Sequence, residues 1–183
     1  MRTTAKIRGV KNLSRLLVCC LATLPFISRA DPGQDALNRG AFREAIVVWS
    51  QAARDAAARK DVRGEVGILV KLAGAQQLAG QPQAAINSWE QAVARAEQSG
   101  DRQLILLAKS SVGGACGCLQ QRSWAETNLR DAIKLAEEFH DDRALAQAWC
   151  GLGHSLAMQG KTTDALAAFE KAAADPVMKP VAL

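Results

Sequence analysis

The sequence is poor in aromatic residues and in proline. It contains no Tyr, its Phe and Trp residues make up 4% of 183 positions, and there are five prolines. Runs of β-branched residues are also missing, which disfavours extended strands. Alanine is abundant instead, and such a composition favours helices that pack closely through small side chains. The expected fold class is therefore all-α.

A long hydrophobic run is absent too, because no stretch reaches the roughly 18 apolar residues of a typical membrane-spanning helix. The first thirty residues nevertheless differ from the rest. Five basic side chains come first, followed by the short apolar segment LLVCCLATLPFI and by the small residues Ser28 and Ala30. This order is typical of a secretory signal peptide, so we expect residues 1–30 to be cleaved before Asp31. An uncleaved membrane anchor is the alternative.

Residues 31–183 have no excess of basic residues. The whole sequence has 23 basic and 18 acidic residues, and residues 1–30 hold six of the basic and none of the acidic ones. The remaining 17 basic and 18 acidic residues give a net charge of −1. Because little charge is left to neutralise phosphates, nucleic-acid binding is not expected. We expect a bacterial periplasmic or secreted protein that does not insert into a membrane after cleavage.

The mature sequence repeats itself every forty residues without an insertion. The equivalent positions are Gly40, Gly80, Gln120 and Gly160; Ala45, Ala85, Ala125 and Ala165; Trp49, Trp89, Leu129 and Phe169; and Ala52, Ala92, Ala132 and Ala172. Two shorter series are Asp61, Asp101 and Asp141, and Ala73, Gly113 and Gly153. Such a period indicates one structural unit that is stacked several times.

The pattern of each repeat predicts two helices. In residues 101–139, Asp101 can cap the first helix. The apolar stripe of that helix is expected at Leu104, Leu107, Ala108, Val112 and Cys116. The second helix follows the polar segment QQRS and has its stripe at Ala125, Leu129, Ala132, Ile133 and Ala136. The large residue of each repeat should fill the space between neighbouring helix pairs, and the glycines suit the left-handed conformation after a helix end.

The last repeat resembles a tetratricopeptide repeat. The family pattern W-x2-L-G-x2-Y…A-x3-F…P is matched, with Leu for Tyr, by Trp149, Leu152, Gly153, Leu156, Ala165, Phe169, Ala172 and Pro176. The resemblance covers residues 33–176. The period is longer than the usual 34 residues, as in the repeats that accompany bacterial CHAT domains, and the first repeat is incomplete.

The resemblance implies an α-α superhelix, a right-handed solenoid of about four helical hairpins. Its repeats would lie near 33–60, 61–100, 101–140 and 141–176, within a domain at 31–176 that is followed by a tail at 177–183. The first helices would line a concave groove that binds a partner peptide or helix. The groove residues are small and mildly apolar: Val70, Gly74, Gln77, Ser110, Gly114, Gly117, Cys118, Cys150, His154 and Met158.

Two explanations of the groove glycines stay open. Gly114 and Gly117 either admit a partner backbone or only permit helices to cross. On the first explanation, Gly114→Arg should abolish binding without unfolding the chain. A groove that clamps a terminal carboxylate is not expected, because only Lys71 falls near a suitable position.

The cysteines and one histidine suggest zinc, since Cys116, Cys118, Cys150 and His154 form Cys-x-Cys and Cys-x3-His. Cys116 and Cys118, however, point to different sides of a helix, and Cys118 and Cys150 should be about 12 Å apart along the axis. We therefore expect no metal, no disulfide and no cofactor, and mostly buried free thiols. His154 could be the base of a nucleophile at Cys150, but without an orienting carboxylate a groove-lining histidine is the simpler interpretation.

Two further expectations concern tryptophan and the chain's end. Trp49, Trp89 and Trp149 should be core residues, whereas Trp124 is either an exposed contact point or packed on the preceding turn. The final helix, near 162–174, has Leu166 and Phe169 on a side without a following helix. This arrangement predicts weak self-association, or a partner, at this end.

The leading functional hypothesis is a non-enzymatic, exported interaction module that binds a protein partner in its groove for scaffolding or assembly. One alternative is a regulatory subunit of a separately encoded CHAT-like or secretion-system protein. The third is a thiol or zinc hydrolase built on Cys118, Cys150 and His154.

Overall fold

The computed structural model describes residues 31–117 and 121–173. The expected signal peptide at 1–30, the tail at 177–183, and Gln120, Cys118 and Pro176 lie outside the described residues. The described part contains eight α-helices, one 3-10 helix and no strand, which confirms the all-α prediction. None of its helices is both long and apolar enough to cross a membrane.

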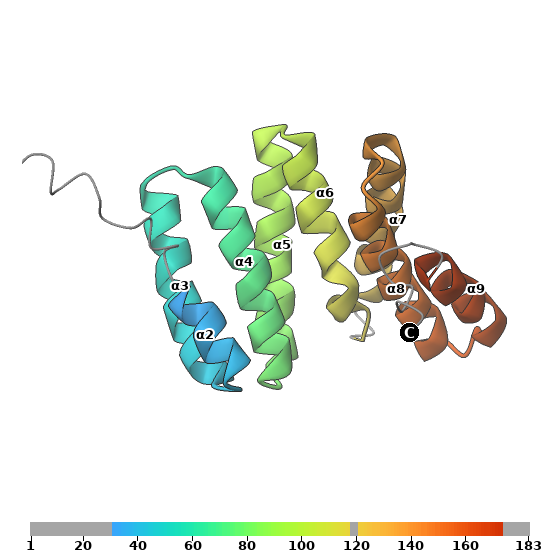
Figure 1. The fold of residues 1–183 in the computed structure, drawn as a ribbon, viewed down its shortest axis with the longest axis horizontal. Coiled ribbons are helices and arrows are strands. Elements are labelled where there is room, and N and C mark those ends of the chain that lie inside the picture. Colours follow the sequence, from blue (N-terminus) through green and yellow to red (C-terminus); the bar gives the residue numbers. More distant parts are fainter. Residues whose placement is uncertain (1–30, 118–120, 174–183) are drawn as a thin grey trace, which may run out of the picture. The chain divides into compact units, whose positions relative to one another are not determined.

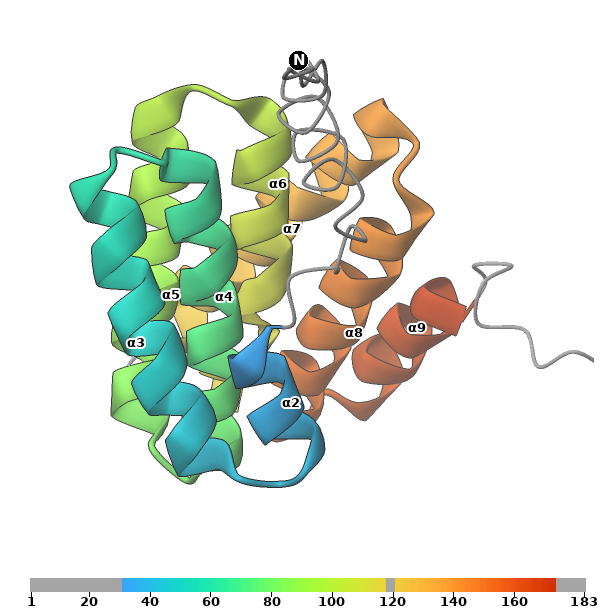
Figure 2. The ribbon, with the colours of Figure 1, turned by 60° about the vertical axis from the view of Figure 1, so that its left-hand side comes forward.

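The helices follow one another with short turns. They are α2 (Pro32–Asn38), α3 (Phe42–Ala58), α4 (Val62–Leu78), α5 (Pro82–Ser99), α6 (Arg102–Ser110), the 3-10 helix η1 (Ser111–Gly117), α7 (Arg122–Phe139), α8 (Asp142–Met158) and α9 (Thr162–Ala173). Each helix packs against the next one along the chain, and α6 also contacts α4 and α8 (Figures 1 and 2). The superhelix itself stays a prediction.

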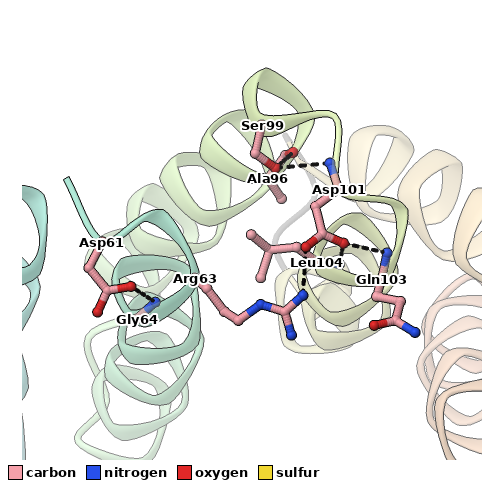
Figure 3. Close-up of polar contacts among 8 residues, drawn as sticks. All are labelled: Asp61, Arg63, Gly64, Ala96, Ser99, Asp101, Gln103 and Leu104. Carbon is pink, nitrogen blue, oxygen red and sulfur yellow. Dashed lines mark hydrogen bonds and ion pairs between the residues drawn. The ribbon is translucent and has the colours of Figure 1, made fainter.

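The periodic aspartates begin three helices, as predicted. The side chain of Asp61 accepts a hydrogen bond from the Gly64 N–H at 2.9 Å, and that of Asp141 accepts one from the Ala144 N–H at 2.9 Å. Asp101 accepts from two N–H groups, those of Gln103 and Leu104, at 3.0 and 3.2 Å (Figure 3). Each bond satisfies an N–H that has no partner within the helix.

Asp101 also joins two repeats. Arg63 of α4 donates a hydrogen bond to its Oδ2 at 2.6 Å (Figure 3). This bond, together with those from the backbone, lowers the pKa of the Asp101 carboxyl below its usual 3.8. The carboxylate form is therefore the form that caps α6.

Residues with a left-handed backbone conformation follow the ends of most of the helices. Gly40, Gly80 and Gly160 have φ values of 75°, 72° and 74°, which confirms the prediction for these three glycines. The turns between repeats use the same conformation, at Lys60, Gly100 and His140, with φ values of 58°, 69° and 53°. The sequence did not reveal this second series, because a positive φ is uncommon for Lys and His.

Most of the periodic apolar positions form the core, and the exceptions among the Ala and large-residue series are Ala52, which is half-buried, and Phe169. Ala45, Ala85, Ala125 and Ala165 are at most 3% exposed. Of the large residues, Trp49, Trp89 and Leu129 are at most 3% exposed, but Phe169 is 37% exposed. Phe169 differs because no described helix follows α9. Trp149, expected in the core, is half-buried and packs against it, and Lys171 Nζ lies 4.2 Å from its ring centroid.

In two repeats, a glycine of the first helix lies directly against the large residue of the second helix. A Cβ atom on Gly33 would lie 2.4 Å from Nε1 of Trp49, and one on Gly153 would lie 2.8 Å from Cε1 of Phe169. Both distances are far below van der Waals contact, so the absence of a Cβ allows the ring to approach. Gly33 and Gly153 are equivalent positions in the repeat, as are Trp49 and Phe169.

The first helix of the third repeat departs from the prediction. The continuous stripe through Cys116 is wrong in part, because α6 ends at Ser110 and the chain tightens into η1. Leu107, expected inside, is 45% exposed, and Leu106 is buried in its place at 4%. The Ser110 and Ser111 hydroxyls donate to backbone carbonyls three residues earlier, and η1 is rich in glycine, which weakens a regular helix.

Asp141→Ala should lower the free energy of unfolding by about 1 kcal/mol, because α8 loses its cap. Asp141→Asn should cost much less, since the amide oxygen can accept the same bond from the Ala144 N–H. Urea unfolding followed by circular dichroism measures both. An equal loss in the two variants would show that the carboxylate charge, and not the capping bond, is what matters.

Candidate functional site

One pocket brings together half of the predicted groove residues. It has a volume of about 600 Å³ and lies among α4, the α6–η1 segment and α8. The predicted residues that line it are Gln77, Ser110, Gly114, Cys150 and His154. Its other lining residues were not predicted, and they are Ser111, Gly113, Arg143, Ala146, Gln147 and Gly151.

The remaining predicted residues do not line this pocket. Val70 and Gly74 of α4 are half-buried, while Gly117 and Met158 are exposed. Cys118 lies outside the described residues. The predicted residues of α6 and α8 that line the pocket therefore share it with Gln77, whereas those earlier in α4 do not line it.

One wall of the pocket is a single face of α8. Arg143, Gln147, Cys150 and His154 follow one another at intervals of four, three and four residues, which places them on the same side of a helix. His154 and Cys150 are both exposed. The expectation that the thiols are mostly buried is wrong for Cys150, because its side of α8 faces the open pocket.

The floor of the pocket is a close crossing of two backbones. A Cβ atom on Gly113 of η1 would lie 3.0 Å from Cα of Gly151 on α8, and one on Gly151 would lie 2.9 Å from Cα of Gly113. Any side chain at either position would separate η1 from α8. The shallow floor therefore depends on glycine at both crossing positions.

Gly114 packs closely against two side chains of the described structure, and the admission of a partner backbone stays a prediction. A Cβ atom on Gly114 would lie 2.3 Å from Cη2 of Trp89 and 2.2 Å from Oε1 of Gln77. The expectation that Gly114→Arg leaves the fold intact is therefore wrong, because the large side chain would displace a core tryptophan. Gly117 differs, since a Cβ atom added there would meet nothing within 4 Å in the described part of the chain.

A buried lysine holds α6 in place just before η1 begins. Lys109 Nζ lies 2.9 Å from Glu97 Oε1 of α5 and 2.9 Å from Asp131 Oδ2 of α7. Burial lowers the pKa of Lys109, but its hydrogen bonds and ion pairs with the two carboxylates outweigh burial and raise the pKa above 10.5. The charged lysine thus bridges three helices beside the pocket.

A polar cluster positions the C-terminal half of α8. Glu126 of α7 accepts hydrogen bonds from the hydroxyl of Ser155 and from the side-chain amide of Gln159. Ser155 is fully buried, and a buried hydroxyl without a partner would be costly. The cluster therefore ties the C-terminal end of α8 to α7.

The chemistry available in the pocket consists of hydrogen bonding and apolar contact. The described residues of its lining supply side-chain amides, hydroxyls, one thiol, one imidazole and one cation, Arg143, and none of them is a carboxylate. Among residues 31–117 and 121–173, no three His, Cys, Asp or Glu side chains are grouped as metal ligands. Trp124, for which two interpretations were open, is half-buried and packs against the core.

No family model and no curated protein matches the chain.

Gly114→Ala should lower the free energy of unfolding by about 1–3 kcal/mol, because its Cβ would force the ring of Trp89 out of place. Gly117→Ala is the matched control in the same 3-10 helix, and its Cβ would meet no atom of residues 31–117 and 121–173 within 4 Å. Guanidinium unfolding followed by tryptophan fluorescence measures both variants. Equal stability of the two variants would contradict the close packing of Gly114 on Trp89.

Proposed function

We propose that this chain is an exported interaction module of the tetratricopeptide-repeat type, which binds a peptide or helix of a protein partner for scaffolding or assembly. The observation that supports the proposal most is the pocket between η1 and α8, where five residues projected from the repeat pattern meet. Export rests on the signal-like segment 1–30.

The pocket suits a segment of polypeptide. Its floor is backbone at Gly113 and Gly151, so a partner chain can approach without displacing side chains. Gln147 and Gln77 line the pocket with amide groups, which can both donate to and accept from a partner backbone. Apolar and backbone contacts would then supply most of the affinity, because Arg143 is the one charged side chain among the described lining residues.

A matched pair of substitutions tests this proposal. Cys150→Arg fills the pocket from an exposed position and should leave the fold intact, whereas Cys150→Ser keeps the size of the side chain. Peptides selected from a random twelve-residue display library against the full chain should bind Cys150→Ser as they bind the original protein. They should lose at least about tenfold in affinity for Cys150→Arg, which corresponds to about 1.4 kcal/mol.

Labelling of the thiol provides an independent readout. A bound peptide should slow alkylation of Cys150 by N-ethylmaleimide, because the thiol lies in the pocket wall. Peptides that bind Cys150→Arg as tightly as the original protein, or that leave alkylation unchanged, would place binding elsewhere on the surface and contradict the proposal.

A further inference from the structure

Arg143 is the one cation among the described residues that line the pocket between η1 and α8. Its side chain is exposed, and within residues 31–117 and 121–173 it forms no ion pair, hydrogen bond or ring contact. The acidic residues closest to it along the chain, Asp141 and Asp142, line a different pocket, beside Leu107 and Phe139. The described lining therefore holds a guanidinium without a carboxylate to balance its charge.

An arginine at the same position of an earlier repeat binds a carboxylate in this structure. Arg63, which is equivalent to Arg143, donates a hydrogen bond to Oδ2 of Asp101 at 2.6 Å (Figure 3). Asp101 follows Arg63 by 38 residues, and the residue at the same interval after Arg143 is Val181. The sequence thus has no carboxylate for Arg143 at the position from which Arg63 receives one.

The place of Arg143 gives the pocket a direction. Arg143 is the first of the α8 residues that line the pocket and His154 is the last, and they are about 16 Å apart along the helix axis. An extended peptide spans this length with about five residues. A single guanidinium can hold one side-chain carboxylate through two parallel hydrogen bonds. The pocket therefore suits an extended peptide with one acidic side chain near one end.

We propose that the peptide bound in this pocket carries an Asp or Glu side chain that pairs with Arg143 at the end of the pocket where α8 begins. This inference rests on the proposed peptide binding, to which it adds a charge requirement and a direction. The pair contributes more to specificity than to affinity, because Arg143 is exposed and water weakens such a pair. A peptide with Lys or Arg at the same point is rejected, since two cations would meet there without a counter-charge.

Probes for this pairing are the peptides of the twelve-residue display library that slow alkylation of Cys150 in the full chain. Each should contain an Asp or Glu whose replacement by Asn or Gln raises the dissociation constant about fivefold, as measured by fluorescence anisotropy. Arg143→Gln should weaken the original peptide by the same factor and should not weaken the Asn or Gln peptide further. Arg130→Gln is the matched control, because Arg130 is exposed on α7, does not line the pocket and carries the same charge.

The outcomes separate this pairing from peptide binding as such. Binders without an acidic residue, additive losses in the cycle, or equal effects of Arg143→Gln and Arg130→Gln would overturn the pairing while peptide binding stands. If amidation of the peptide's C-terminus abolishes the effect of Arg143→Gln, the bound group is a terminal carboxylate and the pairing with a side chain is wrong. Failure of every peptide to protect Cys150 would contradict the proposed function and this inference with it.

Discussion

The structure depends on one steric constraint, which is that large side chains of one helix pack against positions without a Cβ on another. Trp49 meets Gly33, Phe169 meets Gly153, and Trp89 meets Gly114 of the following hairpin. Each of these contacts joins helices that are adjacent along the chain or belong to adjacent repeats. Alanine at the neighbouring periodic positions keeps the helix axes close enough for the contacts to form. Exposed charge adds less to cohesion, since three of the six ion pairs among the described residues join side chains that are at least one-third exposed, where such pairs stabilise little.

Much of this fold could be predicted because the constraint repeats in the sequence. The forty-residue period is enough to place the capping aspartates, three left-handed glycines and the buried alanines. The turns at Lys60 and His140 were not predictable, because their side chains do not favour a positive φ and only the packing of the repeats requires it. The break at Ser111 was missed for a related reason. The repeat alignment implies a regular helix there, whereas glycines and serine hydroxyls within η1 act locally against it.

The sequence pattern anticipated five of the residues that line the pocket but not the rest of its lining. Residues equivalent by the forty-residue period do share a face, so Ser110 and Cys150 both line the pocket. The depth of the pocket, however, depends on where the backbones of η1 and α8 cross. They cross at Gly113 and Gly151, which are not equivalent positions in the repeat. Cys150, next to Gly151 on α8, is exposed at the wall of this pocket. The lysine bridge from Lys109 to two helices was likewise not expected, since a buried cation requires partners that are distant in sequence.

A double-mutant cycle between Trp89 and Gly114 tests the central claim most directly. The free energies of unfolding of the original protein, Gly114→Ala, Trp89→Leu and the double variant would be measured by guanidinium unfolding. If the ring of Trp89 is what a Cβ at Gly114 strikes, the cost of Gly114→Ala should largely disappear when Trp89 is already Leu, giving a coupling of about 1 kcal/mol or more. Additive costs, with coupling within about 0.3 kcal/mol, would show that the two residues do not constrain each other and would contradict the account.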